Sequence, residues 1–267
     1  MTANAHYALS NDWKDARQRL GLLEEVFDPG TIRHLERIGV GEGWRCLEAG
    51  AGSGNIADWL SRRVGSSGHV VATDINTRLL DALTAPNVEV LRHDIVADAL
   101  PQGVFDLVHA RALLIHLPGR DRALDRMLTA LKPGGWLLIE EPDYVSEHLV
   151  SSEDAEVREV FRRVIEARAK FNQVRGFDGF YGRTVLNELR VRGMANVSAE
   201  GCMNVCAGGA PMSRFVQVSF EQLQPRLLAL GDVIELELAA YVRLLGDPTN
   251  VFMWPAMIAT WGQKPEF

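Results

Sequence analysis

The sequence predicts an α/β fold in which a doubly wound, mostly parallel sheet is covered by helices on both faces. From residue 45 to residue 140, short apolar runs alternate with helix-like segments, which is the pattern of such a sheet. The first apolar run, at 45–49, leads into a turn with glycine at every second position and then into an amphipathic helix at 55–64. Before and after this region the pattern is mainly helical, so we expect helical additions to the sheet.

The first 40 residues are predicted to form two helices. Residues 7–28 repeat apolar side chains every three or four positions, and Pro29 with Gly30 is expected to end this helix. A second helix is predicted at 31–38 and closes at a glycine. We expect this N-terminal region, 1–40, to form a helical lid near the open end of the first strand.

The remaining elements follow from the same patterns. Further strands are predicted at 69–73, 88–92, 105–109 and 136–140, with a turn at 132–135 before the last of these. Helices are predicted after residue 76 through 83, near 113 and at 120–131. Beyond residue 145 we expect helices at 152–171 and 184–192, two helices within 211–247 broken at Gly231, and strands at 197–205 and 251–261. We expect a single domain, 1–267, in which segments 150–195 and 207–250 form a helical cap on the substrate side.

Composition limits the classes of function. The chain has 267 residues, of which 47% are apolar and 24% charged, as in an ordinary soluble protein with a full core. It contains no apolar run of about 18 residues, and its first residues lack the basic start and apolar centre of a signal peptide, so we expect a cytoplasmic protein without a membrane segment. The formal net charge is −7, whereas a nucleic-acid binder would carry a basic surface. We therefore expect no nucleic-acid partner.

The three cysteines, Cys46, Cys202 and Cys206, are expected to be free thiols. Their number is odd, and the chain is too long to need stapling by disulfides. Cys202 and Cys206 have no matching pair of cysteines or histidines nearby, so we expect no metal site.

The glycine turn after the first strand is a candidate ligand site. Gly50, Gly52 and Gly54 permit positive φ angles and a close approach of the backbone to a ligand, and the following helix begins with unpaired N–H groups. Dinucleotides and S-adenosylmethionine (SAM) both bind at such turns. The dinucleotide pattern is G-x-G-x-x-G, but here the glycine spacing is two throughout, and Glu48 precedes the first glycine by two residues. A carboxylate there would repel a pyrophosphate and would suit an ammonium group.

This segment resembles the first motif of the class I SAM-dependent methyltransferases, in which an acidic residue is followed by three alternating glycines. The resemblance covers about residues 40–145 and includes the glycine-containing turn into the fifth strand. It implies a Rossmann-like, small-molecule methyltransferase with SAM as cofactor and S-adenosyl-L-homocysteine (SAH) as product. It also implies a seven-stranded sheet in the order 3-2-1-4-5-7-6, with the last strand antiparallel.

The resemblance implies cofactor roles for further residues. Asp74, at the end of the second strand, is similar to the family acid that binds both ribose hydroxyls, and Ile75 to the apolar wall beside the adenine. Asp94 and Ile95 resemble the pair that reads the adenine edge, and the carbonyl of Ala110 is expected to accept from the methionine ammonium. The full expected cofactor set is Tyr7, Glu48, Ala49, Gly50, Gly52, Asp74, Ile75, Asp94, Ile95, Ala110 and Arg111.

The N-terminal helix offers further candidates, because small-molecule methyltransferases often fold such a helix over the site. Tyr7 near the sulfonium, or Arg17 or Arg19 at the methionine carboxylate, would be chemically apt. The alternative is an amphipathic helix whose basic face is solvated.

The methyl acceptor is expected at the carboxyl ends of the fourth and fifth strands, where open α/β sheets place ligands. Methyl transfer from a sulfonium is a direct displacement, so a base is needed only if the nucleophile must lose a proton. His116 has the intrinsic pKa best suited to a base, but helix packing also explains it, and no catalytic residue is assigned. The expected substrate contacts are His116, Asp143, Tyr144 and Tyr181, and Arg111 and Glu141 lie at the same strand ends.

The segments after the fifth strand carry side chains that either line an apolar acceptor pocket or belong to the core or to a dimer surface. They are Phe177, Phe180, Tyr181, Met212, Phe215 and Phe220.

Absent motifs narrow the acceptor class. The sequence lacks the Asn-Pro-Pro-Tyr or Asp-Pro-Pro-Tyr segment of amino-directed DNA methyltransferases, the Pro-Cys nucleophile of cytosine-C5 enzymes, and a clear metal pattern like that of catechol-type enzymes. We expect a small organic acceptor, methylated at O, N or C. The arginine-rich, lysine-poor composition is typical of a high-GC bacterium, where such enzymes often act in secondary metabolism.

Two other functions stay open on the sequence alone. One is a methyltransferase-like fold used for ligand binding or for a non-methylating reaction. The other is an NAD(P)-dependent oxidoreductase. The sequence leaves the acceptor, the pathway and the oligomeric state undecided, a homodimer included.

Overall fold

The main sheet of the protein has seven strands. The computed structural model describes residues 8–151 and 154–266. In the order of the sheet, the strands are β3 (Val88–Arg92), β2 (His69–Asp74), β1 (Arg45–Ala49), β4 (Phe105–Arg111), β5 (Leu131–Asp143), β10 (Ala256–Gln263) and β7 (Ala195–Cys202). The first five are parallel, and β10 is antiparallel to both of its neighbours. The predicted fold class, strand order and antiparallel last strand are confirmed.

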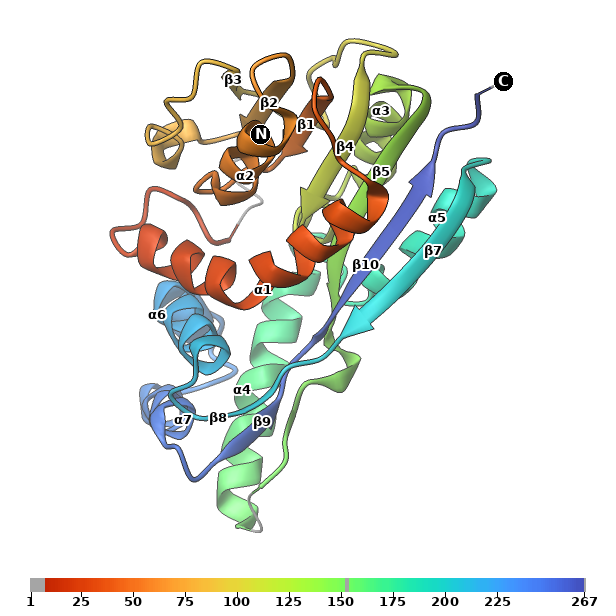
Figure 1. Cartoon of the computed structure of the whole chain (residues 1–267). Helices are drawn as coiled ribbons and strands as arrows, with labels where there is room; N and C mark the ends of the chain where they lie inside the picture. Colours follow the sequence, from red (N-terminus) through yellow and green to blue (C-terminus); the bar gives the residue numbers. More distant parts are fainter. Residues whose placement is uncertain (1–7, 152–153, 267) are drawn as a thin grey trace.

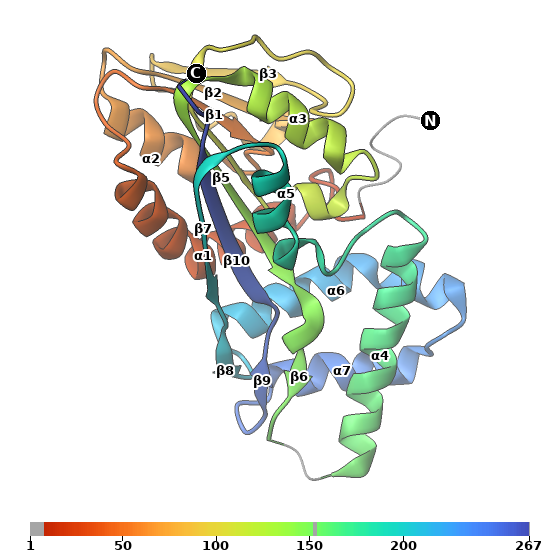
Figure 2. The ribbon, with the colours of Figure 1, turned by 90° about the vertical axis from the view of Figure 1, so that its right-hand side faces the viewer.

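Helices cover both faces of this sheet, as Figure 2 shows. One face carries α1 (Ala16–Ile38) and α2 (Asn55–Val64), and the other carries α3 (Arg120–Ala130) and α5 (Val185–Val191). Each face has its own apolar core, because successive residues of a buried strand point to opposite sides. For example, Leu107 packs on the side of α2, whereas Val108 packs on the side of α3.

A helical layer lies beyond the carboxyl ends of the parallel strands (Figure 1). It consists of α4 (Ala155–Gln173), α6 (Pro211–Leu230) and α7 (Glu235–Gly246), and it packs around a third apolar core with aromatic residues such as Tyr241 and Trp254. A small antiparallel sheet of β6 (His148–Leu149), β9 (Val251–Met253) and β8 (Val205–Ala207) borders this layer. Short 3-10 turns lie at Thr77–Leu79, Leu114–His116, Tyr144–Ser146 and Tyr181–Arg183.

Three strands of the main sheet continue into the small sheet. β5 is followed by β6, β7 by β8, and β9 by β10. The break between β9 and β10 falls at Trp254 and Pro255, where proline cannot donate to a ladder. The single last strand predicted at 251–261 and the strand predicted at 197–205 are therefore each divided between the two sheets.

The prediction of two separate N-terminal helices, at 7–28 and 31–38, was wrong. The structure has one helix, α1, which begins at Ala16 rather than at residue 7 and contains Pro29 in its interior. Proline removes one helical hydrogen bond, but buried residues on both sides of it, such as Leu22 and Leu35, pack against the rest of the protein. Tertiary packing therefore overrides the local stop signal.

The helix predicted after residue 76 was also wrong. Only the 3-10 turn Thr77–Leu79 forms there, with the Asn76 side chain accepting from the N–H of Arg78. Pro86 disfavours a helical conformation in the residue before it, and the connection to β3 is short. The residues of the turn predicted at 132–135 lie within β5, at the point where its pairing register with β4 shifts.

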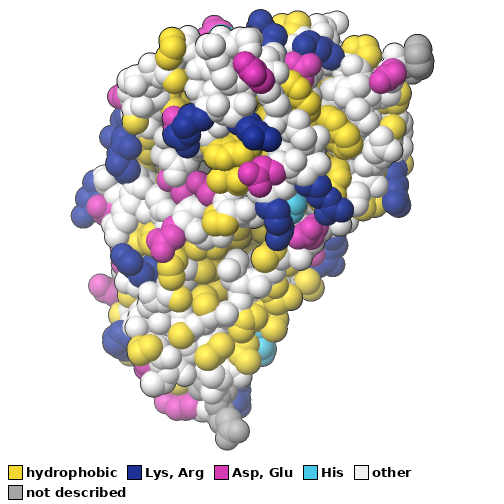
Figure 3. Space-filling view, in the orientation of Figure 1, with side chains coloured by type: hydrophobic (Ala, Val, Ile, Leu, Met, Phe, Trp, Pro, Cys, Tyr) yellow, Lys and Arg dark blue, Asp and Glu magenta, His cyan; other side chains and the backbone are white. Residues whose placement is uncertain are grey.

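The surface differs between the two halves of the molecule. In the space-filling view, hydrophobic side chains gather over the region of β8, β9 and the adjoining helices (Figure 3). Val205, the first residue of β8, and Met203 shortly before it are both exposed. Among the described residues, no helix combines the length and the apolar character that crossing a membrane requires.

Candidate active site

The glycine turn between β1 and α2 exposes backbone atoms without side chains to the main cavity. Gly50, Gly52 and Gly54 have φ angles of +71°, +61° and +95°, a region that side-chain-bearing residues rarely adopt. A Cβ atom at Gly50 would lie 3.0 Å from the Leu113 side chain, and one at Gly54 would lie 2.9 Å from Leu83. At Gly52 a Cβ would be 3.6 Å from Leu20, so this position alone of the three leaves ordinary space above the backbone.

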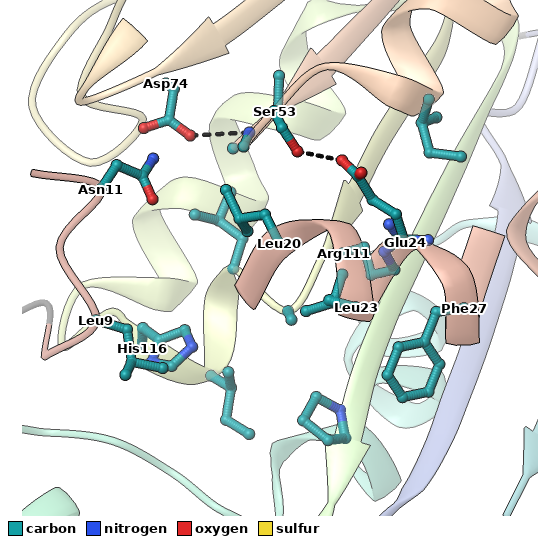
Figure 4. Close-up of a pocket in the computed structure, with 18 of the residues that line it drawn as sticks. Leu9, Asn11, Leu20, Leu23, Glu24, Phe27, Ser53, Asp74, Arg111 and His116 are labelled. Atoms are coloured by element: carbon teal, nitrogen blue, oxygen red, sulfur yellow. Dashed lines mark hydrogen bonds between the residues drawn. The ribbon is translucent and has the colours of Figure 1, made fainter. Parts of the chain in front are cut away.

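Asp74 ends β2 beside this turn. Its carboxylate accepts from the N–H of Gly52 at 3.1 Å and from the N–H of Asn76 at 2.9 Å. Burial raises the pKa of Asp74, and the backbone hydrogen bonds oppose that rise. Asp74 and Asn11 lie on the same side of the cavity in Figure 4. A carboxylate held by backbone donors at this point can accept from the hydroxyl groups of a ligand.

Helix α1 forms the opposite wall of the cavity through Leu20, Leu23, Glu24 and Phe27 (Figure 4). The hydroxyl of Ser53, in the glycine turn, donates to Glu24. Burial raises the pKa of Glu24, although the hydrogen bond from Ser53 opposes this. The glycine turn is therefore clamped between the sheet and α1, with two carboxylates facing it.

Arg111 lies at the carboxyl end of β4 and also lines the cavity. Its guanidinium donates to Asp28 at 2.7 Å and to the hydroxyl of Thr31 at 2.8 Å, and both partners belong to α1. These bonds fix α1 to the end of the sheet.

A buried chain of charged side chains runs behind the cavity, on the α1 face of the sheet. Glu48 and His109 are neighbours in the β1–β4 pairing, and Glu48 Oε2 lies 2.6 Å from His109 Nδ1. His109 Nε2 lies 3.4 Å from Glu140 Oε2, and the other oxygen of Glu140 lies 2.9 Å from His34 Nδ1. Thr31 also donates to Glu140.

The electrostatics of this chain depend on His109 carrying a charge. Burial alone would lower the pKa of His109, but the carboxylates of Glu48 and Glu140 raise it to about 9. Burial would likewise raise the pKa of Glu140, but hydrogen bonds from His109 and His34 hold it well below its usual range. The acid that precedes the glycine turn is thus supported by an imidazolium from the neighbouring strand.

The main cavity has a volume of about 230 Å³ and gathers most of the expected cofactor residues. Those that line it are Glu48, Gly50, Gly52, Asp74, Ile75, Asp94, Ile95 and Arg111. Ala49 and Ala110 are buried strand residues outside this lining, and Tyr7 lies outside the described residues. The carboxylate of Asp94 accepts from the N–H groups of Val96 and Ala97, so it also closes its own turn.

The loop after β4 carries His116 to the other end of the same cavity. Burial lowers the pKa of His116 to about 3, and the positive charges of Arg19 and Arg120 add to this effect. Its ring lies 5.1 Å from the ring of Phe177. The imidazole is therefore neutral at physiological pH, and it sits among apolar neighbours.

Glu141 of β5 fixes this loop by hydrogen bonds to its backbone. Its carboxylate accepts from the N–H groups of Leu113, Leu114 and Ile115 at 3.1, 2.7 and 3.3 Å. Burial raises the pKa of Glu141 to about 8, against the effect of these three hydrogen bonds. Sequence reasoning placed Glu141 at the right strand end but gave it no such role.

Replacing Glu141 with alanine is expected to lower the free energy of unfolding by about 2–4 kcal/mol, because three buried N–H groups lose their acceptor. Glu141→Gln should lose less, since its amide oxygen can still accept two of the three bonds. Urea unfolding at pH 7 measures both. Equal losses for the two variants would mean that the hydrogen bonds do not hold the loop.

A second cavity of about 80 Å³ adjoins the main one under the helical layer. The residues that line both cavities are Leu9, His116, Tyr144, Phe177, Met212, Phe215 and Pro255. The smaller cavity is also lined by Arg168, whose guanidinium forms a bidentate pair with Glu147 and lies 4.7 Å from the Tyr144 ring.

The structure brings together some of the expected substrate residues and separates others. His116 and Tyr144 line both cavities. Asp143 lies outside either lining and pairs with Arg183 at 2.7 and 2.8 Å. Tyr181 packs in the core on the α3 side, and Phe180 is exposed.

Other cavity residues were missed by sequence reasoning. Asn11, Glu24 and Ser53 face the cavity, and His109 supports Glu48 from the neighbouring strand. The only signal for His109 was a histidine within an apolar strand. Glu24 could have been suspected only as an acidic residue on the predicted helix 7–28, whose contact with the sheet was not defined by the sequence.

Comparisons with known proteins agree with this fold. A family model described as a methyltransferase domain matches residues 5–192. The ubiquinone/menaquinone biosynthesis C-methyltransferase UbiE of Pseudomonas putida (strain GB-1) is 38% identical over 143 residues, which are 49% of this chain and 56% of that protein. The chain thus spans about half the length of the curated relatives it matches.

Solved structures resemble most of the chain at low identity. Phosphoethanolamine N-methyltransferase 2 of Haemonchus contortus, solved with phosphomonomethylethanolamine and SAH, is 18% identical and has a TM-score of 0.53, over 93% of this chain and 52% of that chain. The [4+2]-cyclase SpnF is 19% identical and has a TM-score of 0.55, over 89% of this chain and 81% of that chain. At these identities the likeness shows the fold alone.

Proposed function

This chain belongs to the methyltransferase domain family, as a class I SAM-dependent methyltransferase, and we propose that it moves the methyl group of SAM to a small organic acceptor. The observation that carries the proposal is one continuous cavity with two chemically different ends. One end presents the glycine turn with Glu48 and Asp74, and the other presents His116 among apolar side chains. The first end fits a cofactor with hydroxyl and ammonium groups, and the second fits an organic acceptor.

The cofactor end has the donors and acceptors that SAM requires. Asp74 would accept from the ribose hydroxyls, Ile75 would pack beside the adenine, and Glu48 would attract the ammonium group. Gly52 would leave room for the methionine portion, because no side chain projects from its backbone. SAM supplies an electrophilic methyl group on a sulfonium.

The residues of the chain would contribute mainly by positioning and by excluding water. Leu20, Leu23 and Phe27 of α1 cover the cavity from one side, and Met212 and Phe215 of α6 close it from the other. An apolar enclosure around a cationic sulfonium keeps water from competing with the acceptor and favours a direct displacement.

We extend the proposal to the division of the chain. The described part of the N-terminal region, 1–40, is the lid over the cavity, because α1 lines the cavity from Arg19 to Phe27. Segments 150–195 and 207–250 are the cap over the acceptor end, because Phe177, Met212 and Phe215 line the cavity from them.

Replacing Asp74 with alanine is expected to weaken SAM binding by about 1–3 kcal/mol, which is roughly 5- to 150-fold, through the loss of charge-assisted hydrogen bonds. Calorimetric titration with SAM and with SAH measures the change. Asp81→Ala is a matched control, since Asp81 is an exposed acid that follows β2 and does not line the cavity.

Unchanged SAM affinity in a folded Asp74→Ala variant would contradict the site. Stabilisation of the wild-type protein by NAD(P) but not by SAH would favour an oxidoreductase instead. Tight SAM binding without transfer to any member of a broad metabolite panel would favour a non-methylating role.

A further inference from the structure

Arg19 is a buried cation in the wall of the main cavity. It belongs to α1, lines the cavity and is only 2% exposed. Its Nη2 donates to the carbonyl of Leu9 at 3.2 Å, which fixes the guanidinium in place. Its Nε is buried and has no hydrogen-bond partner in the described part of the chain. The side chain is therefore positioned, and its Nε is a donor without an acceptor among the described residues.

Arg19 also differs from two other arginines that line the cavities. Arg111 pairs with Asp28, and Arg168 pairs with Glu147. Within residues 8–151 and 154–266, Arg19 forms no ion pair with a carboxylate, and residues 1–7 contain no acidic side chain in their sequence. A buried charge without a partner is costly, and an anionic ligand entering the cavity would offset that cost.

The position of Arg19 assigns it to the acceptor end of the cavity. The positive charges that act on His116 are those of Arg19 and Arg120. The positive charges that act on Glu24, beside the glycine turn, are those of Arg111 and Arg17. Leu9, whose carbonyl accepts from Arg19, lines both cavities together with His116, whereas Glu24 and Arg111 line the main cavity alone.

We propose that Arg19 binds the oxyanion of the methyl acceptor, which is therefore a compound with an ionisable oxygen: a phenol, an enol or a carboxylic acid. This inference rests on the proposed methyltransferase function. A guanidinium stabilises such an anion by charge-assisted hydrogen bonds, and the neutral imidazole of His116 adds no competing positive charge. Apolar neighbours such as Phe177 and Phe215 suit the hydrocarbon part of the acceptor.

The reaction balances with the groups named. The hydroxyl proton of the acceptor leaves to water, and the oxygen, or a carbon conjugated with it, supplies the electron pair of the new bond to the methyl group. The S–CH3 bond breaks with its electron pair on sulfur, which gives the uncharged thioether of SAH. Attack through carbon is completed when that carbon loses its proton to water.

The test uses the full-length protein saturated with SAH. Calorimetry compares 4-nitrophenol and benzoate with their uncharged counterparts 4-nitroanisole and benzamide. The wild-type complex should bind each anionic probe at least about tenfold more tightly than its counterpart. Arg19→Met should abolish this preference, and Arg19→Lys should retain part of it because the charge remains. Arg17→Met, on the exposed side of the same helix, should retain all of it.

Two results would overturn the proposal. The first is that the wild type binds charged and uncharged probes with the same affinity or binds none of them. A preference for the anionic probes that survives in Arg19→Met would overturn it equally. The second concerns the cofactor. If Arg19→Met weakens the binding of SAH about tenfold or more and leaves unchanged the binding of 5′-methylthioadenosine, which lacks the carboxylate, Arg19 binds the carboxylate of the cofactor instead.

A different result would contradict the proposed methyltransferase function itself. In that case the wild-type protein would not bind SAH before any acceptor probe is added. Thermal unfolding of each variant shows whether the fold is retained, and Arg19→Lys keeps the test valid if Arg19→Met does not fold.

Discussion

Replacement of His109 with leucine is expected to lower the free energy of unfolding by about 3–5 kcal/mol at pH 7. The change removes the imidazolium between Glu48 and Glu140 and leaves two buried carboxylates without their cation. Chemical denaturation monitored by circular dichroism measures the loss. His69→Leu is a matched control, because His69 also lies in the sheet but is partly exposed in its contact with Glu89.

The pH dependence of the same variant gives a second measurement. Because the pKa of His109 is raised from 6.5 to about 9 in the folded protein, its stabilising effect is complete below pH 6.5 and is lost as the pH rises through 9. The wild type should lose about 3 kcal/mol more stability than His109→Leu over that interval, because Glu141, whose pKa is raised to about 8, titrates in both proteins. Parallel pH profiles for the two proteins would show that His109 is uncharged in the folded state.

Replacement of Gly52 with valine is expected to abolish detectable SAM binding while the protein still folds. A Cβ at Gly52 would fit against Leu20, but the two further methyl groups of valine would extend into the cavity between α1 and the glycine turn. The φ angle of +61° adds a conformational strain of about 1–2 kcal/mol. Calorimetric titration with SAM measures the binding, and thermal unfolding measures the strain.

Gly103→Val separates these two effects. Gly103 has a φ angle of +64°, no atom lies within 4 Å of a Cβ placed there, and it is not part of the cavity lining. It should show the strain without loss of SAM binding. If Gly103→Val reduced SAM binding as much as Gly52→Val, the effect would be one of global stability, and the glycine turn would not be the cofactor site.

The parallel half of the fold could be predicted because its signals are local. Apolar runs of strand length, the helix at 55–64 and the glycine turn each specify their own backbone. The N-terminal helix could not be divided correctly, because Pro29 is a strong local stop signal and only the packing of Leu22 and Leu35 keeps α1 continuous. The divided strands at residues 203–204 and 254–255 likewise reflect pairing with distant strands.

The same limit applies to the candidate site. That Glu48 and Asp74 lie at the cavity could be predicted, because Glu48 precedes the glycine turn and Asp74 ends the next predicted strand. The role of His109 depends on strand register, which makes it a neighbour of Glu48 across β1 and β4. Arg19 was a candidate for the methionine carboxylate, but its burial without an acidic partner and its closeness to His116 appear only in three dimensions.

The passage of three strands from the main sheet into the small sheet determines which wall of the cavity can open. Swinging the helical layer outward would require β5, β7 and β10 to bend at the same time near their ends. Residues 8–15 carry no strand pairing and are held instead by side chains, with Gln222 donating to the carbonyl of Ser10 and Arg226 to that of Ala8. Water can replace such bonds one at a time, so we expect residues 8–15 to open more readily than the helical layer.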